Sequence, residues 1–486
     1  MSHRLLSFAL IWMLSWCAST AQAQLARSAI ITQDEARRHG LHRAWMTQVD
    51  MDRSKDRVRS VVLYQPQPKP PAAADPKAGE PLKLGDENQA EENAAPAAGK
   101  NPFGNDQGAA DNNPFGADPA AADAADANAD ADAADPADAD AAAKPAGPAA
   151  PPSFSYPGEP GMLLVQTELG LLHALDAETG RTVWVQQIGN RARPSETPAV
   201  NDQYVAVING MELYLLERKN GRLVWQRRLT NVSVSGPTLS ENFVYALAID
   251  GKLTAFNVDD PSRNWHYSSF GRVDAPLVVT RRAMAWASDR GHVYLSQVDT
   301  PNLSGRFESG KPFTAQLTYW PPLIYAPSQD GYLYALSEID GAAVWRHSLG
   351  EALHKPATPI GDTVYVVTEI GGLIALTTDQ GLERWYVPQI EQFLAASPTR
   401  IYAYDSGRRL VALNRNTGAP ITSMFLPGID LLFSNRQSDR LYVGTSTGLI
   451  QCLHEIGQDK PQVHTFPPAP AAPKRGAVRG GNQAAQ

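Results

Sequence analysis

Short runs in which apolar and polar residues alternate fill the chain between residues 160 and 457. Such alternation is typical of β-strands that bury one face. One unit recurs, and its clearest copy reads Gly331-Tyr-Leu-Tyr-Ala-Leu336. Its first glycine recurs eight times, 36 to 41 residues apart, at Gly170, Gly210, Gly251, Gly291, Gly331, Gly371, Gly407 and Gly448.

Each copy of the unit predicts the same succession of strands. A strand such as Thr363–Thr368 precedes the glycine, and dipeptides such as Asp330-Gly331 favour the left-handed backbone of a two-residue hairpin. A second turn, Thr179-Gly180 in the first copy, leads into a strand with a tryptophan. Repeats of about 40 residues built from short strands are typical of β-propellers. We predict an all-β fold, an eight-bladed β-propeller over residues 158–458.

A large aromatic residue recurs in the strand after the second turn. We interpret these residues as groups that dock one blade against the next. A ring of exposed aromatic residues that binds sugars is the alternative. Phe307 takes the place of the fourth aromatic and Thr422 that of the seventh, and the tryptophans are Trp184, Trp225, Trp265, Trp345 and Trp385.

The eighth copy ends before its tryptophan strand, and the missing strand lies near the N-terminus. Residues 40–49, which contain Trp45, match residues 381–390 with one inserted residue, and residues 57–64 have the composition of a further strand. We therefore predict that the segment 24–65 completes the last blade through residues 40–64 and closes the ring. Closure would hide edge strands that an open ring exposes.

Residues 66–157 form an Ala-, Asp- and Pro-rich tract with 16 Asp or Glu and five Lys, a net charge of −11. Because so few apolar residues cannot offset chain entropy, we predict a disordered insertion here and a disordered tail over 459–486. Within the tract, Asn-Pro-Phe-Gly occurs at 101–104 and at 113–116. It is either a partner-docking motif or a chance duplication.

The rest of the chain carries a net charge of +3, which excludes the strong positive field of a nucleic-acid-binding protein. Residues 1–23 are typical of a cleaved signal peptide, with an apolar core of about 12 residues that is too short to span a bilayer. Trp16 stands where a lipid-attachment signal has a small residue, so we expect cleavage after Ala23 rather than a lipid anchor at Cys17. The protein would then be exported to the periplasm or cell envelope. Cys452, the remaining cysteine, occupies a position that holds alanine in other repeats and is interpreted as a buried filler.

The units resemble pyrroloquinoline-quinone-like repeats, whose pattern is a strand, Asp-Gly, x-Leu-Tyr-Ala-Leu-Asp, Thr-Gly and then Trp. This resemblance covers about 320 residues and implies a quinoprotein-like propeller. Two families share it, the quinoprotein alcohol dehydrogenases and BamB, the propeller scaffold of outer-membrane β-barrel assembly. The dehydrogenases have adjacent cysteines over the cofactor and oxygen ligands for Ca²⁺. This chain has no Cys-Cys pair and no acidic cluster in its repeats. We therefore expect no catalytic, cofactor-binding or metal-binding residues.

The function we predict is that of a non-enzymatic, BamB-like, protein-binding scaffold of the cell envelope, with outer-membrane protein assembly as its specific role. The alternatives are a dehydrogenase dependent on pyrroloquinoline quinone and a carbohydrate-binding propeller. We expect a monomer that binds envelope or outer-membrane proteins through inter-blade loops, and not nucleic acid; whether it also associates peripherally with a membrane stays open. The candidate loop residues are Arg191, Arg193, His354 and Lys355.

Three motifs match known sites, but their context contradicts each match. Gly444-Thr-Ser446-Thr-Gly448 has the spacing of a hydrolase nucleophile turn, yet a strand follows it where that motif needs a helix. The phosphate-loop-like residues 305–312 end in Pro312 rather than Ser or Thr. His39 and His42 have a metal-ligand spacing after a helix-capping pattern, and we interpret them as a surface pair.

Overall fold

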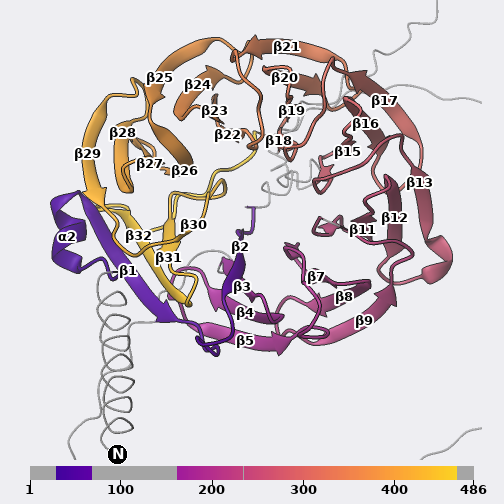
Figure 1. Ribbon diagram of the computed structural model, residues 1–486, viewed down its shortest axis with the longest axis horizontal. Coiled ribbons are helices and arrows are strands. Elements are labelled where there is room, and N and C mark those ends of the chain that lie inside the picture. Colours follow the sequence, from indigo (N-terminus) through magenta and orange to yellow (C-terminus); the bar gives the residue numbers. More distant parts are fainter. Residues whose placement is uncertain (1–28, 68–160, 234, 468–486) are drawn as a thin grey trace, which may run out of the picture. The chain divides into compact units, whose positions relative to one another are not determined.

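The computed structural model describes residues 29–67, 161–233 and 235–467. Their strands form eight antiparallel sheets of four strands each, arranged as blades around a central axis (Figure 1). The predicted eight-bladed β-propeller is therefore confirmed. The predicted signal peptide, most of the acidic insertion and the end of the tail lie outside the described residues. No helix in the described part of the chain combines the length and the apolar character needed to cross a membrane.

Each blade begins with its inner strand, next to the central axis, and ends with its outer strand (Figure 1). In this order, the first four blades comprise β2 (Val58–Tyr64), β3 (Met162–Thr167), β4 (Leu171–Asp176) and β5 (Thr182–Gln187); β6 (Ala199–Val200), β7 (Tyr204–Asn209), β8 (Glu212–Glu217) and β9 (Leu223–Arg228); β10 (Thr238–Leu239), β11 (Phe243–Leu247), β12 (Lys252–Asn257) and β13 (Trp265–Ser268); and β14 (Val278–Val279), β15 (Ala283–Ala287), β16 (His292–Gln297) and β17 (Leu303–Glu308).

The last four blades comprise β18 (Thr318–Trp320), β19 (Leu323–Pro327), β20 (Tyr332–Ser337) and β21 (Ala343–Ser348); β22 (Thr358–Ile360), β23 (Thr363–Thr368), β24 (Gly372–Thr377) and β25 (Glu383–Pro388); β26 (Ile390–Ala396), β27 (Arg400–Asp405), β28 (Arg409–Asn414) and β29 (Pro420–Phe425); and β30 (Leu431–Leu432), β31 (Leu441–Gly444), β32 (Leu449–Glu455) and β1 (Leu41–Gln48). Two short helices complete the described elements, α2 (Gln33–Arg38) and the 3₁₀ helix η1 (Pro261–Arg263).

The last blade takes its outer strand from the N-terminal segment, as predicted. Strand β1 pairs antiparallel with β32 from Leu41 opposite Glu455 to Gln48 opposite Leu449. In this register Trp45 lies opposite the buried Cys452, as Trp184 lies opposite Ala174 in the first blade. The N-terminal segment therefore closes the ring and covers the edge of β32.

The second predicted strand of that segment belongs to a different blade. Strand β2 pairs with β3 of the first blade, from Val58 opposite Thr167 to Tyr64 opposite Met162. The prediction that residues 40–64 lie entirely in the last blade is therefore wrong for residues 58–64. Alternation identifies a strand locally, but the sheet that it joins is decided by the ring, in which each outer strand leads to the inner strand of the next blade.

Tryptophans of the outer strands dock five neighbouring pairs of blades. Each indole Nε1 donates a hydrogen bond to a main-chain carbonyl of the next blade, at 2.7–3.0 Å. In four pairs the indole packs against the second-turn glycine of that blade, where a Cβ would lie within 2.8 Å of the ring. The donors and acceptors are Trp45 and Ala177, Trp184 and Arg218, Trp225 and Val258, Trp345 and Thr378, and Trp385 and Arg415.

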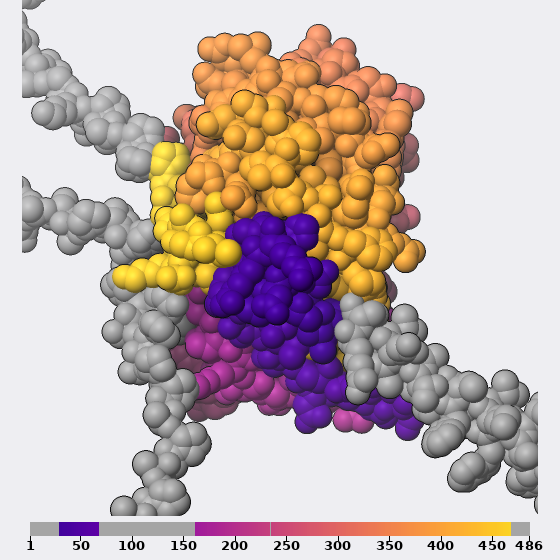
Figure 2. All heavy atoms as spheres, turned by 90° about the vertical axis from the view of Figure 1, so that its left-hand side faces the viewer, coloured from indigo at the N-terminus to yellow at the C-terminus, as the bar shows by residue number. Residues whose placement is uncertain are grey.

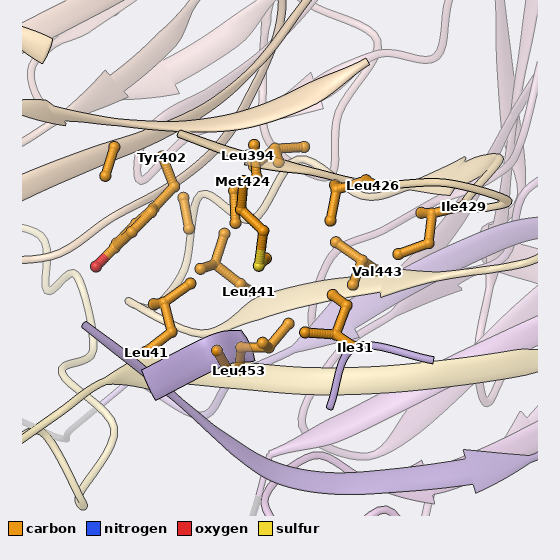
Figure 3. Close-up of a cluster of buried hydrophobic side chains, with 14 residues drawn as sticks. Ile31, Leu41, Leu394, Tyr402, Met424, Leu426, Ile429, Leu441, Val443 and Leu453 are labelled. Carbon is orange, nitrogen blue, oxygen red and sulfur yellow. The ribbon is translucent and has the colours of Figure 1, made fainter. Parts of the chain in front are cut away.

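The contact between blades 7 and 8 is built differently. Helix α2, capped by Thr32, precedes β1, and Ile31 and Leu41 join a buried cluster formed by both blades (Figure 3). In the space-filling view the N-terminal segment lies against the outer wall of these blades (Figure 2). Thr422 stands where other blades have an aromatic residue, and its Oγ1 lies 2.7 Å from the Nδ1 atom of His39.

The chain continues beyond β32 along the inner strands. Val463 forms a β-bridge with Ser438, and the Phe466 ring packs edge-on against Trp320, with 5.3 Å between the ring centroids. Composition predicts a disordered tail from residue 459 onward, but residues 459–467 pack on the propeller. A proline-rich segment can be held by contacts with distant strands, which its own composition does not reveal.

Candidate protein-binding surface

Two kinds of connection gather on one face of the propeller, which we call the loop face. They are the loops from the outer strand of each blade to the next inner strand, and the hairpins between the second and third strands. The two kinds are hydrogen-bonded to each other, as where the Ile188 N–H donates to the Gly170 carbonyl and the Val49 N–H to the Gly448 carbonyl, both at 2.8 Å. Main-chain hydrogen bonds thus hold this face in one conformation.

Arg191 and Arg193, two of the predicted loop residues, lie on the loop face between blades 1 and 2. The Nε atom of Arg191 donates to Gln187 Oε1 at 3.1 Å. The aliphatic part of Arg193 lies beside Gly210, where a Cβ would come within 2.8 Å of Arg193 Cδ. Both arginines therefore belong to an ordered loop.

The other two predicted residues, His354 and Lys355, lie on the same face between blades 5 and 6. His354 Nδ1 is 3.3 Å from Thr314 Oγ1, and Lys355 Nζ donates to the Glu391 carbonyl at 3.0 Å. These residues are four blades away from Arg191 and Arg193 around the ring. The structure therefore does not bring the four predicted residues together in one site.

Three large apolar side chains on the loop face are exposed to solvent. Val232 is 51% exposed, Phe270 66% and Ile370 88%, and all three lie in loops or hairpins of this face. The Arg290 guanidinium carbon lies 5.6 Å from the centre of the Phe270 ring, and the Tyr294 hydroxyl accepts a hydrogen bond from the Phe270 N–H. An aromatic side chain fixed in an exposed position is typical of protein-binding surfaces.

An open cavity of about 970 Å³, which we call the arginine groove, lies on the loop face between blades 7 and 8. Its floor is apolar, with Leu426, Ile429, Leu449 and the ring of Tyr404. Burial raises the pKa of the Tyr404 hydroxyl, so this tyrosine is neutral. The remaining lining comes from the N-terminal segment, from one hairpin each of blades 7 and 8, and from the loop that joins these blades. It comprises Ala29, Ile30, Gln48, Arg53, Ser54, Arg57, Arg408, Gly428, Asp430, Thr445 and Thr447.

The groove has an excess of positive charge. Arg57 donates to the carbonyls of Arg53 and Asp56 at 2.6 and 2.7 Å, which leaves its charge without a carboxylate partner among the described residues. Arg53 and Arg408 likewise form no ion pair within the described ranges, and their side chains are exposed. The one carboxylate of the lining, Asp430, accepts hydrogen bonds from the Ser446 N–H and hydroxyl at 2.7 and 2.6 Å.

Arg408 has an unusual backbone for its residue type. At this hairpin position seven blades have a glycine with a φ of 63° to 94°, whereas blade 7 has Arg408 with a φ of 58°. The assignment of Gly407 as the seventh hairpin glycine is therefore wrong by one position. A left-handed non-glycine residue costs roughly 1–3 kcal/mol and often occurs at functional sites. Sequence reasoning missed the groove, and the Gly407-Arg408 shift in the repeat was the signal available.

The structure shows which contacts are made by the residues whose motifs matched known sites. The Ser446 hydroxyl donates to Asp430 in a hairpin between two strands. His42 Nδ1 faces His454 Nε2 at 3.1 Å across β1 and β32, while His39 contacts Thr422, so the two histidines have different partners. Burial raises the pKa of the Cys452 thiol, which keeps it protonated. The described residues contain no group of three or more His, Cys, Asp or Glu side chains placed to hold a metal ion.

Comparisons with known proteins identify one family. The family model described as outer membrane protein assembly factor BamB matches residues 168–311 and 290–428, which together span more than half of the chain. A curated relative, the outer membrane protein assembly factor BamB of Moranella endobia (strain PCIT), is 21% identical over 324 residues, covering 60% of this chain and 82% of the relative. The crystal structure of BamB from Moraxella catarrhalis matches with a TM-score of 0.51 and 16% identity, covering 60% of this chain and 93% of that chain.

Proposed function

The chain belongs to the family of the outer membrane protein assembly factor BamB, and from this premise we propose that it is a non-enzymatic scaffold of the cell envelope. It binds other envelope proteins, and its specific role is in outer-membrane protein assembly. The observation that carries the proposal is the loop face, where Val232, Phe270 and Ile370 are exposed on loops fixed by main-chain hydrogen bonds.

The mechanism of binding that we propose follows from the rigidity of the propeller. Docked tryptophans hold neighbouring blades at fixed angles, and the loops of different blades therefore keep fixed relative positions. A partner that binds such a surface orders few side chains or loops, so little free energy is lost on association. The exposed apolar side chains then supply burial of about 25 cal/mol per Å² of apolar surface.

The test is affinity capture of detergent-solubilised envelope proteins with the full-length protein. We expect recovery of outer-membrane assembly proteins, and a large loss of recovery with Val232→Ser/Phe270→Ser. The matched control is Ile339→Ser, because Ile339 is 64% exposed but lies in a second turn on the opposite face. Recovery of no envelope protein above background would contradict the proposed function, and equal losses in the control would contradict the assignment of the loop face.

A further inference from the structure

Two histidines face each other across the strands that close the ring. His42 of β1 and His454 of β32 are directly opposite in the antiparallel register, although 412 residues separate them in the sequence. His42 Nδ1 lies 3.1 Å from His454 Nε2. His454 is 4% exposed and His42 is half-buried. The pair does not belong to the loop face, which these strands reach at their other end, where Gln48 is opposite Leu449.

The separation of the two nitrogens suits a shared metal ion. Imidazole nitrogens bind zinc at about 2.0–2.1 Å. Two nitrogens at that distance from one ion lie about 2.9 Å apart at a coordination angle of 90° and about 3.3 Å apart at the tetrahedral angle. The observed 3.1 Å falls between these values. An ion can therefore bridge the two nitrogens without movement of either strand.

The orientation of the rings agrees with this geometry. In a head-on hydrogen bond the ring centroids would be farther apart than the nitrogens by a full ring diameter. The centroids of His42 and His454 are 4.9 Å apart, which exceeds the 3.1 Å between the nitrogens by less than the diameter of an imidazole ring. The rings are therefore inclined to the line between the nitrogens, as two ligands of one ion are.

A main-chain contact holds His454 in the tautomer that a metal ligand needs. Its Nδ1 atom lies 2.9 Å from the Glu455 carbonyl, to which only a protonated nitrogen can donate. In the neutral ring Nε2 therefore carries a lone pair toward His42, as in metal sites where a carbonyl orients the ligating histidine. His42 Nδ1 then holds the shared proton. Metal binding would transfer that proton to His42 Nε2, which has no hydrogen-bond partner among the described residues.

The charges around the pair permit a cation to bind. Burial lowers the pKa of His454, so its ring is neutral at pH 7. Arg440 opposes positive charge at His454, but it is itself paired with Glu178 and Asp439 at 3.1 and 3.5 Å. The Asp459 carboxylate favours positive charge there. Because a histidine must be unprotonated to bind a metal ion, these surroundings leave His454 ready to do so.

We propose that His42 and His454 together bind one divalent transition-metal ion, Zn²⁺ or an ion of similar chemistry. Imidazole is a preferred ligand of Zn²⁺, Cu²⁺ and Ni²⁺. The described residues offer no group of three or more His, Cys, Asp or Glu ligands, so water completes the coordination. The ion would join the first strand of the described chain to the last and strengthen the contact that closes the ring. The inference is independent of the proposed function, because it concerns no partner protein.

Zinc titration of the full-length protein without a histidine tag tests the site. We expect His42→Gln and His454→Gln each to weaken binding of one equivalent of Zn²⁺ by about tenfold or more. The double variant should lose no more than either single variant, because both histidines hold the same ion. The control is His39→Gln, which removes a histidine of the same segment that contacts Thr422 instead and should leave the affinity unchanged. Unchanged affinity in the His42 variant, or an equal loss in the control, would overturn the inference.

Hydrogen exchange measures whether the ion joins the two strands. A ligand that binds only the folded protein shifts the folding equilibrium about 100-fold at 100 times its Kd. Zn²⁺ at that concentration should therefore slow amide exchange in β1 and β32 of the unaltered protein and of His39→Gln, but not of His42→Gln. This comparison does not depend on the stability of the His454 variant. Slowing that is equal in all three proteins, or absent from the unaltered protein, would overturn the inference.

Discussion

The contacts on either side of blade 7 solve the same packing problem in different ways. Between blades 6 and 7, Trp385 packs against Gly418 and donates to the Arg415 carbonyl at 3.0 Å. Between blades 7 and 8, Thr422 has replaced the aromatic residue, and α2 with Ile31 and Leu41 fills the space (Figure 3). The first contact comes from the repeat alone, whereas the second requires a segment nearly 400 residues away in sequence. The arginine groove lies at the second contact, where the repeat no longer dictates the surface.

Among the changes that test this comparison, removal of the N-terminal segment should have the largest effect on the stability of the protein. Deletion of residues 29–49 removes α2 and β1, so the contact between blades 7 and 8 loses its filling and β32 becomes an exposed edge. We expect loss of the monomeric, cooperatively melting protein, measured by light scattering and thermal denaturation. Deletion of residues 70–155 is the control and should leave the melting temperature unchanged. A monomer that lacks residues 29–49 and melts like the intact protein would contradict the closure role.

The tryptophan contact can be compared directly with its replacement. Trp385→Ala removes a buried indole and its hydrogen bond and should destabilise the protein by about 3–5 kcal/mol. Thr422→Ala, at the equivalent position of the next blade, should cost less than about 1 kcal/mol, because the helix and not Thr422 fills that contact. Denaturant midpoints of the two variants provide the measurement. Similar losses would show that the two contacts rely equally on this position.

The contact between blades 8 and 1 adds a buried ion pair to its tryptophan. Arg440 is 1% exposed and its Nε atom lies 3.1 Å from Glu178 Oε2. Arg440→Met should destabilise by roughly 3 kcal/mol at pH 7.5, because the Glu178 carboxylate stays buried without its partner. Burial already raises the pKa of Glu178, and loss of Arg440 raises it further. The folded variant then binds more protons than the unfolded chain, so its stability increases as the pH falls, and the deficit should be smaller at pH 5 than at pH 7.5. Urea denaturation at both pH values tests this, and a deficit independent of pH would exclude an unpaired carboxylate as its cause.

The smallest effect concerns the hairpin position that distinguishes blade 7. Arg408→Gly should leave stability unchanged or raise it by up to about 1 kcal/mol, because strain is relieved while glycine gives the unfolded chain more freedom. Gly371→Ala, at the equivalent position of blade 6, should lower stability by about 1 kcal/mol. A Cβ there meets no atom closer than 3.9 Å, so backbone strain alone is measured. A loss of stability in Arg408→Gly would indicate that the guanidinium contributes to folding rather than to binding.

Features that recur in every repeat could be predicted from the sequence. Features in which one repeat differs from the others could not. Glycine spacing and strand alternation predicted eight blades, and Trp45 identified the strand that completes the last one. The pairing partner of β2 could not be predicted from the local pattern, because a strand can form its main-chain hydrogen bonds with the edge of any sheet. The arginine groove was missed because its lining comes from Arg53 near one end of the chain and Arg408 near the other, and because Gly407 took the place of Arg408 in the repeat. These residues come together only when the ring closes, and no single segment of the sequence reveals this.

Closure of the ring also depends on the order in which its strands are synthesised. Leu41 is synthesised 414 residues before its partner Glu455. Throughout that interval β1 has no strand to pair with, although β2, only ten residues further on, can already join the first blade. Long-range pairing of this kind is slow and leaves strand edges open to aggregation. The ring therefore closes only after residue 455 has been made, and until then β1 lacks the strand with which it pairs.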